Sequence, residues 1–189
     1  MTELVLTPSQ TAGPFLTIGL IDGPISDRLV DDSHARAIRI SGVLLDGAGD
    51  PVTDGMVEIW QANEAGRYAH PADDRDEIPL EDGFSGFGRS ATRDGGRFEF
   101  VTVKPGRVPW VDGRLQAPHV LVGVFARGLL KRLATRMYFP DEEAANAEDP
   151  VLLGLEAEQR ATLVARAEDG ALAFDIVLQG AGQTTFFAV

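Results

Sequence analysis

Asp-Gly pairs constrain the fold of this chain more than any other sequence feature, because seven of them divide its 189 residues into short segments. Asp-Gly is a preferred tight-turn pair because both residues tolerate positive φ angles. The pairs begin at residues 22, 46, 54, 82, 94, 112 and 169. Turns at this density leave room for short strands and little room for long helices. We therefore expect an all-β fold.

The segments between these turns have strand composition. In the run 97–103, Phe98, Phe100 and Thr102 alternate with other residues, which predicts that they share one face of a strand. The run 119–125 is apolar throughout after His119 and predicts a strand buried on both faces. Many short strands separated by turns are typical of a β-sandwich or a β-barrel. The remaining predicted strands are 37–43, 56–62, 173–178 and 184–187.

Helix signals are sparse. Residues 156–167 contain good helix formers and predict one short helix, while residues 141–145 offer a possible cap and an acidic first turn for another. Residues 128–136 fit a helix or a strand equally well, and residues 86–89 indicate a sharp turn.

Three segments, 1–36, 68–88 and 104–118, lack periodicity and are expected to be long loops, which in a compact domain are more often functional than idle. We expect residues 1–36 to form an extended arm that contacts a partner, and residues 37–189 to form the folded domain.

Charge and composition exclude several classes of function. The net charge of −12 argues against binding to nucleic acid or to an anionic membrane, since both need a basic face. The chain has no cysteine, which excludes disulfides, thiolate metal sites and a cysteine nucleophile. The first residues lack the pattern of a signal peptide, and no apolar run is long enough to span a membrane. A cytoplasmic protein is the expectation.

Few side chains are available for catalysis. Nucleophile-elbow, P-loop, dinucleotide-binding and HExxH motifs are all missing from the sequence. Of the three histidines, His34 is expected at the surface, His70 lies in a polar loop, and His119 opens an apolar strand. A buried histidine bonded to backbone is the favoured interpretation of His119. Arg127 follows the same strand, where it would either be paired or line a site for an anionic ligand, and the residues alone leave both alternatives open.

A series of strings, in one order along nearly the whole chain, resembles the intradiol ring-cleavage dioxygenases. They are TPSQTAGPF (7–15), GVLLD (42–46), VEIWQAN (57–63), GRY (66–68), FEFVTVKPG (98–106), APH (117–119), FARG (125–128), TRMYF (135–139), FDI (174–176), QG (179–180) and TFF (185–187). The resemblance implies a β-sandwich of the intradiol type, with long loops and one or two short helices. It also implies cleavage of a catecholic ring with O₂.

Members of this family bind Fe(III) through two tyrosines and two histidines, whose hard oxygen and imidazole donors suit a ferric ion. The resemblance places these four positions at Tyr68, Val108, His119 and Leu121. An arginine that shortly precedes the first histidine in the family is replaced by Gln116. Since valine and leucine offer no lone pair, the resemblance implies a vestigial site and no metal in this chain.

Within the family, the TPSQTAGPF start and the ARGLL segment at 126–130 resemble the alpha chain of heteromeric members. In those enzymes a beta chain holds the iron, and the alpha chain helps to wall the substrate pocket at the interface. The resemblance therefore implies pocket roles for Thr11, Gly13, Pro14 and Arg127, with Arg127 favouring an anionic aromatic acid. The implied partners are a beta chain, a small aromatic acid and O₂.

Two alternatives remain at this stage. The chain could bind iron by itself if Tyr138 or His70 replaced a lost ligand. It could also be a β-sandwich scaffold with no catalytic role.

Overall fold

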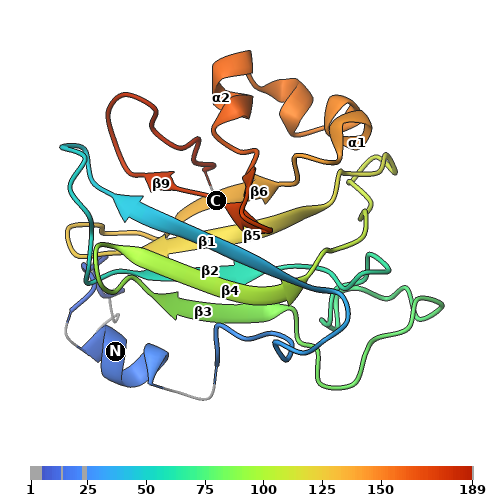
Figure 1. The fold of residues 1–189 in the computed structure, drawn as a ribbon, viewed down its shortest axis with the longest axis horizontal. Helices are drawn as coiled ribbons and strands as arrows, with labels where there is room; N and C mark the ends of the chain where they lie inside the picture. Colours follow the sequence, from blue (N-terminus) through green and yellow to red (C-terminus); the bar gives the residue numbers. More distant parts are fainter. Residues whose placement is uncertain (1–5, 14, 23–24, 189) are drawn as a thin grey trace, which may run out of the picture.

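Two facing sheets form a β-sandwich in the computed structural model, which describes residues 6–13, 15–22 and 25–188 (Figure 1). The first sheet has the order β4-β1-β8-β7, and β9 also pairs with β1. Its strands are β1 (Ala37–Leu45), β4 (Arg97–Val103), β7 (Arg166–Glu168), β8 (Ala171–Ala173) and β9 (Ile176–Val177). The second sheet has the order β3-β2-β5-β6, from β2 (Met56–Trp60), β3 (Phe87–Ala91), β5 (His119–Phe125) and β6 (Leu133–Tyr138). This arrangement confirms the all-β prediction.

The core lies between the sheets and is built from alternate residues of their strands. Phe98 and Phe100 of β4 are buried on one face, as their spacing predicts, and Phe100 pairs with Ile40 of β1. Val120 and Val122 of β5 face them from the second sheet and belong to the same buried cluster. Each such apolar side chain contributes about 1.5–3 kcal/mol when buried. Because even-numbered residues of β5 face the core, its odd-numbered residues point to the outer face of the second sheet.

Most predicted strands are confirmed, with differences near the C-terminus. The predicted strands 97–103 and 119–125 match β4 and β5, and 37–43 extends to Leu45 in β1. The predicted strand 56–62 ends at Trp60, and 173–178 divides into the ends of β8 and β9. The prediction for 184–187 is wrong, because Phe187 forms only an isolated bridge with Ala134.

The sequence-based turn at residues 86–89 is also wrong. Gly86 does turn the chain, with φ of +68°, but β3 begins directly after it at Phe87. A Cβ at Gly86 would lie 2.2 Å from the Gln61 carbonyl oxygen, so this close approach requires glycine. The glycine-rich run thus starts an edge strand, which glycine content alone does not favour.

Helices are short and cluster beyond one edge of the second sheet, above β6 (Figure 1). They are α1 (Glu143–Glu148), η2 (Leu152–Gly154) and α2 (Ala157–Ala161), in addition to η1 (Thr17–Ile21) near the start of the chain. The predicted helix 156–167 is therefore too long. It ends early because the backbone pairs with β6 instead: the Tyr138 amide donates to Leu163, and the Ala165 amide donates to Tyr138.

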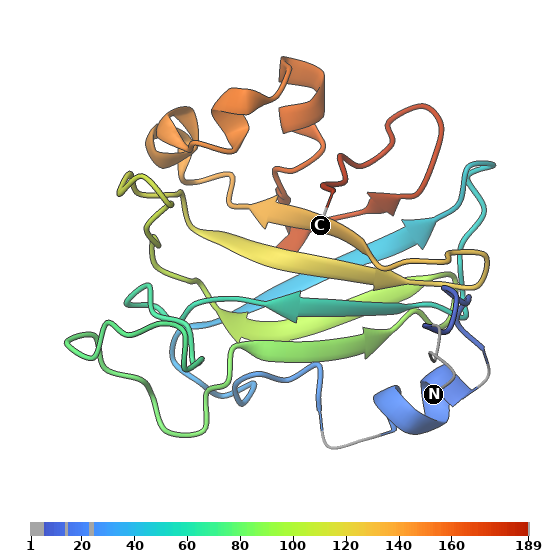
Figure 2. The same cartoon turned by 180° about the vertical axis from the view of Figure 1, so that it is seen from behind.

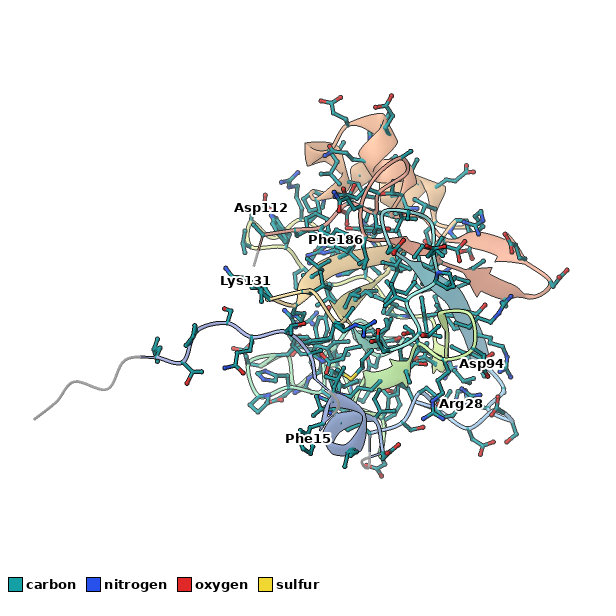
Figure 3. The ribbon with its side chains drawn as sticks, turned by 90° about the vertical axis from the view of Figure 1, so that its left-hand side faces the viewer. Phe15, Arg28, Asp94, Asp112, Lys131 and Phe186 are labelled. Carbon is teal, nitrogen blue, oxygen red and sulfur yellow. The ribbon has the colours of Figure 1, made fainter. Side chains whose placement is uncertain are left out.

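Part of the N-terminal segment is built into the sandwich. The Leu29 amide donates to Val101 of β4 (2.8 Å), and the Arg89 amide of β3 donates to Ser26 (3.1 Å), so residues 26–29 bridge the edges of the two sheets. Phe15, by contrast, is 79% exposed and lies at the lower edge of the molecule in Figure 3. Partner contact by residues 1–36 stays a prediction. No helix in the described part of the chain is long and apolar enough to cross a bilayer.

A substitution at Gly42 of β1 tests how tightly this strand packs against the backbone at Phe174. A Cβ at this position would lie 2.0 Å from the Phe174 carbonyl oxygen, and backbone cannot yield as a side chain can. We expect Gly42→Ala to lower the free energy of unfolding by roughly 3 kcal/mol. Urea unfolding followed by circular dichroism measures this. Gly154→Ala is the matched control, because nothing lies within 4 Å of its added Cβ. Equal midpoints for the two variants would contradict the packing described here.

Candidate functional site

One row of side chains crosses the outer face of the second sheet at the end where β5 begins. In the strand pairing, Leu121 of β5 lies between Trp60 of β2 and Arg136 of β6. His119 shares this face and pairs with Tyr138 in the neighbouring row. The strands therefore bring two of the four implied ligand positions, His119 and Leu121, to one surface.

Two long loops leave the same end of the sheet and supply the other two positions, Tyr68 and Val108 (Figure 2). The Tyr68 ring packs against Trp60 with 4.8 Å between ring centroids. Tyr68 and Val108 line one cavity of about 350 Å³, together with Trp60, His70, Asp73, Arg75, Pro109 and Gln116. The loops touch backbone to backbone, since a Cβ at Gly66, where φ is +83°, would lie 2.1 Å from the Arg107 carbonyl oxygen.

His119 is buried and neutral. Its Nδ1–H donates to the Ala117 carbonyl oxygen at 2.8 Å, because a carbonyl can only accept. Burial, aided by the positive charge of Arg136, lowers the pKa of His119 to about 4. The neutral ring keeps its Nε2 lone pair. The interpretation of His119 as a buried histidine bonded to backbone is confirmed.

The donors at the four implied positions do not fit a ferric ion. Tyr68 offers a phenol whose pKa is raised by burial, an effect that the charge of Arg136 partly opposes. His119 offers one imidazole nitrogen, while Val108 and Leu121 present hydrocarbon only. Within the described ranges, no three histidine, aspartate or glutamate side chains gather where they could hold a metal ion.

Neither suggested replacement ligand is well placed. The Tyr138 hydroxyl is buried and already donates to Asp149 Oδ1 at 3.1 Å, and burial raises the pKa of this phenol. His70 is exposed at the cavity, where its Nδ1 accepts a hydrogen bond from the Ala72 amide (3.1 Å). Its ring lies against the edge of Trp60, at 5.7 Å between centroids.

Sequence reasoning missed a polar network that holds this end of the site together. Asp149 is fully buried and accepts hydrogen bonds from the amides of Ala117 (2.8 Å), Val151 and Leu152, besides the one from Tyr138. Arg136 Nη1 donates to Gln116 Oε1 (2.7 Å) and lies 3.3 Å from the Tyr138 hydroxyl. These residues converge only through the register of β6, so their spacing along the chain gives no signal.

The residues predicted to wall a substrate pocket lie at the other end of the second sheet. The Gly128 amide donates to Thr11 Oγ1 at 2.7 Å, which places Thr11 beside Arg127. Arg127 is 80% exposed, with its Nε 3.2 Å from Asp54 Oδ2. It is therefore a surface arginine in an ion pair, which is one of the two alternatives that the residues alone left open, and its role at a site for an anionic ligand stays a prediction. Gly13, two residues after Thr11, is exposed, and Pro14 lies outside the described residues.

These two groups of predicted residues do not form one site within this chain. His119 begins the seven-residue strand β5, and the segment that contains Arg127 follows the other end of this strand. At about 3.3 Å per residue, a strand of this length spans roughly 20 Å. His119 and Arg127 therefore lie too far apart for both to contact one small ligand within this chain.

A family comparison matches residues 21–180 to the family described as "Dioxygenase". A Pseudomonas putida protein named protocatechuate 3,4-dioxygenase alpha chain is 44% identical, with 96% of this chain and 95% of the relative covered. This chain belongs to the intradiol dioxygenase family. The family is iron-dependent.

Two further comparisons support this assignment to the intradiol dioxygenases. A Burkholderia cepacia protein named protocatechuate 3,4-dioxygenase beta chain is 36% identical, over 88% of this chain and 75% of the relative. Among solved structures, the dioxygenase domain of a dioxygenase–carbohydrate-binding fusion from Streptomyces sp. SirexAA-E superposes with a TM-score of 0.56. It is 25% identical and covers 93% of this chain and all of that domain.

Asp149 is the residue through which the network can be tested. Asp149→Ala leaves three backbone amides and the Tyr138 hydroxyl without their acceptor in a buried region, so we expect a loss of about 3 kcal/mol of unfolding free energy. Glu148→Ala, at an exposed neighbouring position, should change it by less than about 0.5 kcal/mol. Thermal and urea unfolding compare the two variants. A similar small effect for both would mean that the network contributes little.

Proposed function

We propose that this chain is the alpha subunit of a protocatechuate 3,4-dioxygenase that works with an iron-bearing beta chain. The heteromer would cleave 3,4-dihydroxybenzoate between its two hydroxyl-bearing carbons, with both atoms of O₂ entering the product, 3-carboxy-cis,cis-muconate. The proposal is supported by the identity to an alpha chain over nearly the whole length, which exceeds the identity to a beta chain. Such a reaction belongs to the breakdown of aromatic compounds.

The iron, on this proposal, belongs to the beta chain. A ferric ion supplies the Lewis acid that binds the catechol oxygens and readies the ring for O₂. Val108 and Leu121 remove two of the four ligands that the resemblance implies, and a pair of ligands rarely holds a metal against water. The observation that most directly supports iron binding by the beta chain alone is that both of these positions carry hydrocarbon side chains, which cannot bind a metal.

Arg127 is the residue of this chain best suited to meet the substrate. It lies on the surface, far from the vestigial positions of its own chain, so its guanidinium is available to a site completed by a partner. A guanidinium binds a planar carboxylate with two parallel hydrogen bonds, which matches the carboxylate of 3,4-dihydroxybenzoate. Asp54 holds the guanidinium in the free chain and would be displaced when the substrate carboxylate arrives.

Thr11 has a supporting role in the same proposal. Its hydroxyl oxygen accepts the Gly128 amide and so ties the N-terminal segment to the residue that follows Arg127. The pocket roles of Gly13 and Pro14 stay implications of the family resemblance. Two apolar side chains are exposed in the segments that contain these residues: Phe15 in the N-terminal segment and Leu130 shortly after Arg127. Their burial against a beta chain would stabilise the heteromer.

Iron content and partner dependence test the proposed function together. We expect the chain purified alone to hold at most about a tenth of an equivalent of iron, with no tyrosinate-to-iron absorption and no ring cleavage. Co-expression with the beta chain should give ring-cleaving activity and iron in proportion to the beta chain. A full equivalent of iron in the chain alone would instead favour an enzyme that binds iron by itself. Heteromer formation without any activity would favour the scaffold alternative.

Arg127 can be tested in the active heteromer. Loss of a charge-assisted hydrogen bond to the substrate should raise KM for 3,4-dihydroxybenzoate roughly 10- to 100-fold in Arg127→Ala, with a smaller change in kcat. The matched control is Arg160→Ala, another exposed arginine, which should leave KM unchanged. Asp54→Asn should not weaken substrate binding, because it only releases Arg127. An unchanged KM in Arg127→Ala would remove this residue from the pocket.

A further inference from the structure

A permanent positive charge stands between the two lost ligand positions. Arg136 lies directly opposite Leu121 in the β5–β6 pairing, on the face that also displays His119. Its Nη1 reaches Gln116 Oε1 at 2.7 Å, and the backbone N–H of Gln116 donates to the Val108 carbonyl oxygen at 2.8 Å. The Arg136 side chain therefore extends from one lost position, Leu121, to the segment that contains the other, Val108.

The same guanidinium is close to the donors that remain. It lies 3.3 Å from the Tyr138 hydroxyl, and its charge is among the influences on the pKa values of both His119 and Tyr68. The guanidinium carbon also lies 5.9 Å from the centre of the Trp110 ring. Among the described residues, no carboxylate lies within 4 Å of Arg136 in a direct ion pair. The buried Asp149 carboxylate is linked to the guanidinium only through the Tyr138 hydroxyl, which accepts from Arg136 and donates to Asp149.

We propose that the Arg136 guanidinium takes the place of the metal cation in this site, so that restoring the two lost ligands does not restore iron binding while Arg136 remains. This inference rests on the proposed function for the placement of iron in the partner. Two cations repel strongly in a partly buried site of low dielectric constant. A guanidinium also has five donors and no acceptor, so it cannot serve as a ligand. The loss of iron is thus a replacement of one cation by another.

The proposal is tested by rebuilding the site in the full-length chain. The starting variant, Val108→Tyr with Leu121→His, restores both lost ligand types and keeps Arg136. The second variant adds Arg136→Gln, which removes the charge and keeps a polar side chain. Each is incubated with ferric iron, desalted, and measured for iron per chain and for tyrosinate-to-iron absorption.

We expect the double variant to stay poor in iron and the triple variant to bind at least about tenfold more, the effect typical of changing an outer-sphere partner. Two controls use the double-variant background. Arg160→Gln removes an exposed positive charge elsewhere and should leave iron uptake low. Arg136→Lys keeps the charge at the site and should also leave it low.

Folding is checked by circular dichroism and thermal unfolding. Arg136 is half-buried and its two hydrogen-bond partners are neutral side chains, so we expect Arg136→Gln to fold. Arg136→Leu provides a second neutral variant of similar size. If both neutral variants unfolded while Arg136→Lys remained folded, folding would require a positive charge at this position, as expected of a guanidinium that takes the place of a cation.

Three results would overturn the inference. The first is near-stoichiometric iron in the double variant, and the second is a folded triple variant that takes up no more iron than the double. Equal uptake with Arg136→Lys and Arg136→Gln would also contradict it, because the charge would then be irrelevant. Failure of the proposed function has a different signature, namely stoichiometric iron in the unmodified chain or an inactive heteromer.

Discussion

The register of β5 between β2 and β6 determines what each face of the second sheet can do. With Val120 and Val122 turned into the core, His119 and Leu121 must face outwards, and the flanking strands then fix Trp60 and Arg136 beside Leu121. A shift of one residue would turn His119 into the core and expose the valines. The buried cluster that stabilises the sandwich therefore also determines which side chains meet on its outer face.

Much of this arrangement follows from the sequence, and the exceptions have physical causes. Alternation in β4 and the apolar run of β5 were sufficient to place the core strands, because burial on one or both faces leaves a local pattern. β3 was missed because its glycine-rich start resembles a turn, and its pairing with β2 is a tertiary contact that no local signal records. The predicted helix 156–167 was too long because backbone pairing with Tyr138 competes with helix propensity after Ala161.

The candidate site also contains some residues that the sequence located and others that it missed. Motifs located Tyr68 and His119, because a ligand position keeps its place within a recognisable string. They could not reveal Asp149 or the position of Arg136, because these residues meet the site only through the pairing of β6 and the fold of the loop after α1. Arg127 shows the reverse case. Its position after β5 was clear from the sequence. Its exposure and its ion pair with Asp54 were not, because Asp54 lies in the turn just before β2 and comes close to Arg127 only in the folded chain.

Buried polar groups are costly unless they are hydrogen-bonded, and the polar groups beside the four implied ligand positions are bonded to one another. The Tyr138 hydroxyl and the Ala117 amide both find an acceptor in Asp149, and the Gln116 side chain accepts a hydrogen bond from Arg136. Each of these groups is satisfied within the chain itself. Thr11 and Arg127, at the opposite end of the sheet, belong to no part of that network. The second sheet thus carries a buried and internally satisfied polar network at one end and an exposed arginine in a surface ion pair at the other, so the two groups of residues are built independently of each other.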